Sequence, residues 1–192
     1  YSGGTVIDHG SLMVLGTNKG LGTGPVTLNA DGVLDLENVN ATNRLILKGG
    51  MINAGNGFGN SWNAPITLNG NTKITSYAFL LLNNNCGGMS GPGGFTQMGS
   101  VGPFGLVNAG TVTLGGTNTY TGPTVVKLGT LRVLKAAALY NADPADWTPA
   151  KITVAPAAGL RLGVGGPGEF TGAQVGTLIR NLTTGVENNG LM

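Results

Sequence analysis

The chain has 192 residues, of which 36 are glycine and 9% are charged, and its 10 basic and 8 acidic residues give a net charge of +2. Glycine costs about 1 kcal/mol at each helix position, so this composition argues against a helical protein. A hydrophobic content of 41% argues against disorder. The charges are scattered singly, which predicts no binding of nucleic acid, and the longest apolar run, residues 77–82, is too short for membrane insertion.

Short apolar runs separated by Gly, Asn, Thr and Pro predict a succession of strands and turns. Residues 18–25 form a turn-rich corner, and residues 53–63 and 86–94 form two glycine-rich interruptions. Residues 136–149 have the most helix-favouring composition, which predicts a projecting loop with about one helical turn. Residues 1–15 are predicted to form two short strands around Gly10. The other predicted strands are residues 26–28, 33–36, 44–48, 66–68, 72–76, 78–82, 112–114, 124–126, 130–134 and 174–182.

An internal repeat supports this assignment. Residues 1–15 match residues 120–134 without a gap, a displacement of 119 residues. Leu131 and Val133 agree with their counterparts in the first copy, whereas Arg132 replaces a methionine, as expected if alternate side chains point into a core and into water. In a second match, residues 26–36 recur as 152–162 with Asp35 replaced by Arg161, which indicates a solvated position.

Residues 110–122, GTVTLGGTNTYTG, followed by TVV at 124–126 and GTL at 129–131, resemble the autotransporter-associated β-strand repeat of bacterial passenger domains. The clear resemblance covers residues 108–139, and a looser one covers 3–36 and 151–162. It implies a right-handed parallel β-helix in an extracellular or cell-surface protein. Repeats of this kind occur in adhesins, stalks and self-associating proteins, so the resemblance predicts the fold more specifically than the function.

We expect one all-β domain over residues 1–192, a parallel β-helix (solenoid) built of repeat blocks at about 1–36 and 108–162. Coils of about 20–25 residues would give roughly eight or nine of them. The alternative is an antiparallel β-sandwich. The chain opens inside a repeat, which we interpret as a fragment or processed unit of a longer or polymeric protein.

No catalytic residue, cofactor site or metal site is predicted. The pattern G-x-G-x-x-G at residues 163–168 contains Pro167 and no predicted helix follows it, so it does not predict phosphate binding. His9 is the single histidine, and its neighbours on a strand would point to the opposite face. A weak Ca²⁺ site formed by Asp31, Asp35 and Glu37 is left open.

We expect a non-enzymatic structural module that forms a rigid stalk or a fibre of copies stacked end to end. Its partners would then be neighbouring repeats or other copies of itself. Stacking would use the strand edges at the two ends of the coil, namely Thr5, Val6, Ile7, Leu178 and Ile179.

Two alternatives belong to other functional classes. A glycan-binding adhesin would use aromatic side chains on projecting loops, although such side chains more commonly cover a core. The aromatic candidates are Trp62, Trp147, Tyr140 and Phe58. An extracellular polysaccharide lyase-like enzyme would depend on the carboxylates of Asp35 and Glu37, with Arg44 or Lys48 as the nearby base.

Overall fold

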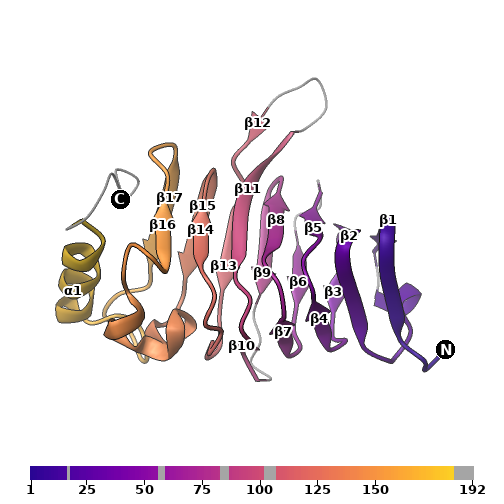
Figure 1. Ribbon diagram of the computed structural model, residues 1–192, viewed down its shortest axis with the longest axis horizontal. Helices are drawn as coiled ribbons and strands as arrows, with labels where there is room; N and C mark the ends of the chain where they lie inside the picture. Colours follow the sequence, from indigo (N-terminus) through magenta and orange to yellow (C-terminus); the bar gives the residue numbers. More distant parts are fainter. Residues whose placement is uncertain (17, 56–58, 83–86, 102–106, 184–192) are drawn as a thin grey trace.

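The computed structural model describes residues 1–16, 18–55, 59–82, 87–101 and 107–183, and within these ranges the chain is a parallel β-solenoid with one α-helix (Figure 1). All pairs of described strands are parallel except β11 with β12. The predicted β-helix is therefore confirmed, and the antiparallel sandwich is ruled out. The strands and helix are β1 (Thr5–Leu15), β2 (Val26–Glu37), β3 (Asn40–Ala41), β4 (Leu45–Leu47), β5 (Met51–Ala54), β6 (Asn60–Trp62), β7 (Ile66–Leu68), β8 (Thr72–Ser76), β9 (Phe79–Leu82), β10 (Met89–Ser90), β11 (Phe95–Val101), β12 (Val107–Asn108), β13 (Thr111–Leu114), β14 (Thr124–Val126), β15 (Gly129–Val133), β16 (Ile152–Val154), β17 (Ala158–Leu162) and α1 (Gly172–Thr183).

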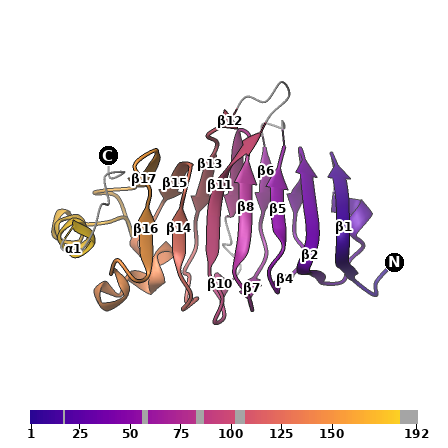
Figure 2. The same cartoon turned by 45° about the horizontal axis from the view of Figure 1, so that its top comes forward.

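Each coil crosses three faces. The first face contains the start of β1 and of β2, then β4, β7 and β10, and the second contains the end of β1 and of β2, then β5, β8, β11, β14 and β16. The third face is a separate sheet in the order β3-β6-β9-β13-β15-β17. Figure 2 shows the second face running along the whole stack.

The register of the strands in the third face gives the length of each turn. Its six strands are separated by five complete turns, fewer than the eight or nine coils predicted. The register steps between stacked residues are 21, 20, 32, 19 and 29 residues. The third and fifth turns carry insertions, but the mean step of about 24 residues lies within the predicted coil length. The prediction was wrong because it divided the whole chain into coils, whereas residues 172–183 form helix α1. The stacked residues are Asn40, Ser61, Leu81, Thr113, Arg132 and Arg161.

The two insertions leave the stack in different ways. In the third turn, β11 and β12 form an antiparallel hairpin that extends beyond the neighbouring strands (Figures 1 and 2). In the fifth turn, residues 136–146 form three short 3₁₀ helices, Ala136–Ala138, Tyr140–Ala142 and Pro144–Asp146. The predicted loop with helical character is confirmed, but its large side chains pack into the protein.

Along each strand, alternate side chains point into the interior of the solenoid. In β15, Leu131 and Val133 are buried and Arg132 is exposed, as predicted. Along the second face, buried Leu34, Ile52 and Ile74 stack directly on one another. Each added coil thus buries apolar surface against the previous one, which stabilises the stack by about 25 cal/mol for each Å² removed from water.

Glycine allows the coils to approach closely at the corners. A Cβ added at Gly93 would lie 2.3 Å from the carbonyl oxygen of Gly70, and one added at Gly122 would lie 2.3 Å from the carbonyl carbon of Gly93. Real Cβ atoms are not found at these distances from backbone atoms. The glycine content therefore reflects backbone contact between successive coils, and not only turn conformation.

The two copies of the internal repeat lie on different faces. The strand beginning at Thr5 stacks on Val26 in the first face, whereas its counterpart beginning at Thr124 stacks on Phe95 in the second. Likewise Leu12 stacks on Leu34 in the second face, but its counterpart Leu131 lies in the third. The repeated unit is therefore a strand, a corner and a strand, and its displacement of 119 residues is not a whole number of turns.

Residues 174–182 were predicted as a strand but belong to helix α1. Thr171 and Gln174 form a capping box, in which the Gln174 amide nitrogen donates to Thr171 Oγ1 (3.2 Å) and the Thr171 amide nitrogen donates to Gln174 Oε1 (2.9 Å). Leu178 and Leu182 are buried in the core cluster. The helix lies beyond β16 and β17 at the C-terminal end of the stack (Figure 1).

Candidate functional site

Of the aromatic side chains proposed for ligand contact, Trp62, Trp147 and Tyr140 are buried, because the segments that carry them fold into the stack. Trp62 lies in strand β6 and not in a loop, and its Nε1 donates to the carbonyl oxygen of Asn43 (2.7 Å). Trp147 donates to the carbonyl oxygen of Leu139 (3.2 Å) and packs on the ring of Phe170 (5.6 Å between centroids). The assignment of Trp62 to a loop was wrong, and the burial of both rings agrees with the alternative that such side chains cover the core.

Tyr140 lies in a buried hydroxyl cluster. Its hydroxyl donates to the carbonyl oxygens of Gly122 (2.9 Å) and Lys151 (3.0 Å), and lies 3.0 Å from Thr124 Oγ1. Thr124 Oγ1 also contacts the hydroxyl of Tyr120 (2.6 Å). The cluster ties the insertion of the fifth turn to the preceding coil. Phe58 lies outside the described residues.

Burial disfavours ionisation of both tyrosines. It raises the pKa of Tyr140 to about 12, and raises the pKa of Tyr120 well above its usual value. A nucleophile or general base would need a lowered pKa, so these hydroxyls act as neutral hydrogen-bonding groups. Their role in the fold is to hold three segments together.

Strand β1 provides the N-terminal edge of the stack. Among the described residues it pairs with β2 alone, so its other side offers unpaired backbone groups. Of the residues predicted for stacking, Val6 is 63% exposed, Thr5 is half-buried and Ile7 is buried. Tyr1, Met13 and Leu15 are also exposed hydrophobic residues of this end.

The C-terminal end differs from the prediction. The proposed edge at Leu178 and Ile179 is helical, so it cannot pair as a strand, and Leu178 faces the protein. Ile179 remains 44% exposed on the helix surface. The side chain of Asn181 donates to the carbonyl oxygen of Pro144 (3.4 Å), which links the helix to the insertion of the fifth turn. Helix α1 therefore covers this end of the stack.

The carboxylates considered for Ca²⁺ do not converge. Asp31 lies 3.7 Å from the imidazole of His9, and Asp35 accepts a hydrogen bond from Asn53 Nδ2 (2.6 Å). Within residues 1–16, 18–55, 59–82, 87–101 and 107–183, no three His, Cys, Asp or Glu side chains form a group suited to a metal ion.

Helix α1 does follow the G-x-G-x-x-G segment, contrary to the prediction. However, the carboxylate of Glu169 accepts a hydrogen bond from the backbone nitrogen of Gly166 (2.8 Å). A negative charge already lies against the loop, which disfavours a phosphate group there. The helix thus gives no reason to assign a dinucleotide site to this segment.

One open groove lies at the corner between the first and second faces. Its volume is about 440 Å³, and we call it the corner groove. Gly49 and Gly50 line it at the bend of the chain. The larger side chains that line it are Asp31, Val33, Lys48, Met51, Asn71 and Lys73.

Among the comparisons with known proteins, a family model matches one segment of the chain. Residues 107–133 match the family model of the passenger-associated-transport-repeat. Neither the search of curated proteins nor the search of solved structures found a match. No helix within the described residues is both long and apolar enough to cross a membrane.

The matched segment contains β13, β14 and β15, which contribute to the second and third faces of the solenoid. The match and the fold confirm the resemblance to an autotransporter passenger repeat, and such a repeat suggests a secreted or surface protein. The chain thus contains a passenger-associated-transport-repeat within a parallel β-solenoid, which fits a structural module of a passenger domain.

Proposed function

We propose that this chain is a rigid stalk segment of a secreted or cell-surface bacterial passenger, and that it acts through its shape and not through catalysis. The observation that carries the proposal is the ladder β1-β2-β5-β8-β11-β14-β16, in which each strand pairs in parallel with the next along the stack. Such a ladder transmits load from coil to coil through backbone hydrogen bonds.

Buried polar side chains add links between coils. Asn60 Oδ1 accepts from the backbone nitrogen of Val39 (3.0 Å). Asn118 Oδ1 accepts from the backbone nitrogen of Met89 (2.8 Å), and its Nδ2 donates to the carbonyl oxygen of Ala138 (2.8 Å). Asn118 thus bridges the coil before it and the coil after it. These buried bonds resist sliding of one coil over another, as a stalk requires.

The two ends favour a stalk over a fibre of identical copies. A head-to-tail fibre needs a free strand edge at both ends, but α1 lies over the C-terminal end (Figure 1). The edge of β1 offers exposed Val6 together with unpaired backbone groups. We assign this edge to pairing with one further parallel coil.

A comparison of the two repeat copies supports that assignment. Tyr120 bonds to Thr124 (2.6 Å), and Tyr1 bonds to Thr5 in the same way (2.7 Å). The ring of Tyr120 is covered by Phe95 from the preceding coil and is 1% exposed, whereas Tyr1 is 72% exposed. A coil packed on β1 would cover Tyr1 as Phe95 covers Tyr120.

The test is electron microscopy of the purified protein combined with light scattering over a range of concentrations. We expect discrete elongated particles of monomer mass over the whole concentration range. Continuous fibres with a repeat set by the solenoid would contradict the stalk and support end-to-end stacking. Hydrolysis of a polysaccharide that is lost in Asp35→Asn would contradict the non-catalytic role.

A further inference from the structure

The corner groove combines positive charge with an apolar strip. Lys48 follows β4 directly, and Lys73 lies in β8 on the next coil, where it stacks on Met51. Both ammonium groups are exposed, and neither forms an ion pair with any residue that the structure describes. Two cations on successive coils therefore face one groove without an ion-pair partner, although the carboxylate of Asp31 lines the same groove.

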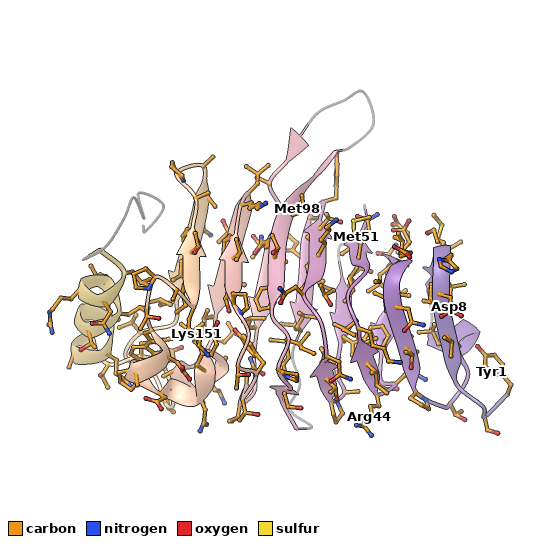
Figure 3. All side chains as sticks on the ribbon, in the orientation of Figure 1. Tyr1, Asp8, Arg44, Met51, Met98 and Lys151 are labelled. Carbon is orange, nitrogen blue, oxygen red and sulfur yellow. The ribbon has the colours of Figure 1, made fainter. Side chains whose placement is uncertain are left out.

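The apolar strip runs along the stack beside these cations. Val33 and Met51 are direct register partners, and both point outward because their neighbours Leu34 and Ile52 are buried. Each is half-buried, so part of its surface remains open to the groove. Figure 3 labels Met51 on its strand.

Polar groups complete the groove. Asn71 Oδ1 accepts from the backbone nitrogen of Gly94 (2.9 Å), which fixes the amide and leaves its NH₂ group available to donate. The carboxylate of Asp31 provides an acceptor at the other side, 3.7 Å from His9. The volume of about 440 Å³ lies within the ~300–1,000 Å³ range of small-ligand sites.

We propose that the corner groove binds a carboxylate-bearing sugar, such as a uronic acid residue of an acidic polysaccharide. The sugar carboxylate lies between Lys48 and Lys73, and the C–H face of the ring packs on Val33 and Met51. The NH₂ group of Asn71 donates a hydrogen bond to one sugar hydroxyl, and the carboxylate of Asp31 accepts one from another. A sugar acid contacts both the lysines and the apolar strip, whereas a bare anion would contact the lysines alone.

The proposal is independent of the stalk function, because a stalk with no ligand remains a stalk. It assigns glycan contact to this groove in place of the buried tryptophans. Since the lysines are solvent-exposed, binding weakens as salt screens the charges.

The test is a titration followed by ¹H–¹⁵N NMR on the purified 192-residue protein. The probes are a trimer of galacturonic acid, a trimer of galactose as the neutral counterpart, and inorganic phosphate. Variants Lys48→Gln and Lys73→Gln each remove one groove cation. Lys127→Gln removes the same charge from another exposed position outside the groove and serves as the matched control.

We expect the acidic trimer to shift resonances of residues 31–33, 48–51 and 71–73. Each groove variant should weaken binding about fivefold or more, while Lys127→Gln changes it less than twofold. The proposal is overturned if the neutral trimer binds equally well, if Lys127→Gln has the same effect as the groove variants, or if no groove resonance moves. Equal binding of phosphate and the acidic trimer would also overturn it, because the sugar ring would then contribute nothing.

Discussion

Replacing Gly93 with alanine tests whether contact between coils explains the glycine-rich corners. The added Cβ would lie 2.3 Å from the carbonyl oxygen of Gly70 and 2.7 Å from its backbone nitrogen. Both are backbone atoms, so no side-chain rotation relieves the overlap. The corner must open, which strains the hydrogen bond from the Gly93 nitrogen to the carbonyl oxygen of Leu68 (2.7 Å).

Overpacking of this kind lowers the free energy of unfolding by about 1–3 kcal/mol. Alanine also restricts the unfolded chain, which offsets about 0.4–1 kcal/mol of that loss. For a chain of 192 residues, each kcal/mol shifts the melting temperature by about 2–4 °C. We therefore expect Gly93→Ala to melt up to about 10 °C below the unchanged protein.

The assay is thermal unfolding followed by circular dichroism, with Gly176→Ala as control. A Cβ at Gly176, on the exposed side of α1, has no atom within 4 Å, so this variant should stabilise the helix by about 0.5–1 kcal/mol. A Gly93→Ala protein that melts at or above the unchanged protein would refute the role of close coil contact.

Three further predictions concern the tyrosine cluster and α1. Tyr140→Phe leaves buried partners without their hydrogen bonds, so we expect a loss of about 1–3 kcal/mol in thermal unfolding, whereas Tyr1→Phe at the exposed end should change little. In the folded protein the pKa of Tyr140 is raised from its ordinary value of 10 to about 12. The stability that its neutral hydroxyl contributes is therefore full below pH 10 and is lost as the pH rises towards 12. By circular dichroism, Tyr140→Phe should lose stability less steeply in this alkaline range than the unchanged protein. Thr171→Ala removes half of the capping box, which should cost about 1 kcal/mol and speed hydrogen exchange in α1, and unchanged exchange there would contradict the cap.

Side-chain alternation predicted the strands because each strand of the solenoid has one buried and one solvated face. Residues 66–68 and 72–76 were located to the residue. The same rule failed for β6, whose flanking glycines suggested a loop although Trp62 points into the core. Local composition cannot tell a glycine that bends the chain from one that lets two coils touch.

Helix α1 could have been found from its capping signal. Thr171 and Gln174 have the spacing of a capping box, but Gly172 and Gly176 lower the helix propensity between and after them. The burial of Leu178 and Leu182 against the last coil compensates for this low propensity. The capping box thus marks where the helix begins, whereas tertiary packing, and not residue propensity, stabilises it.

The corner groove could not be predicted because its residues come together only through the stacking of coils. Asp31, Lys48 and Lys73 are separated by 17 and 25 residues in sequence and belong to successive coils. Their meeting depends on the register of β2, β5 and β8, which requires the exact length of every corner. The sequence alone placed Asp31 only beside Asp35 and Glu37.

The placement of the two repeat copies on different faces has a consequence for how such a chain can change in length. A unit that occurs on two different faces of the solenoid is not restricted to one angular position around its axis. Duplicating or deleting one strand-corner-strand unit would rotate every following residue to a neighbouring face while leaving the core apolar. Surface features such as the corner groove would then be redistributed around the rod, even though no residue that forms them had been altered.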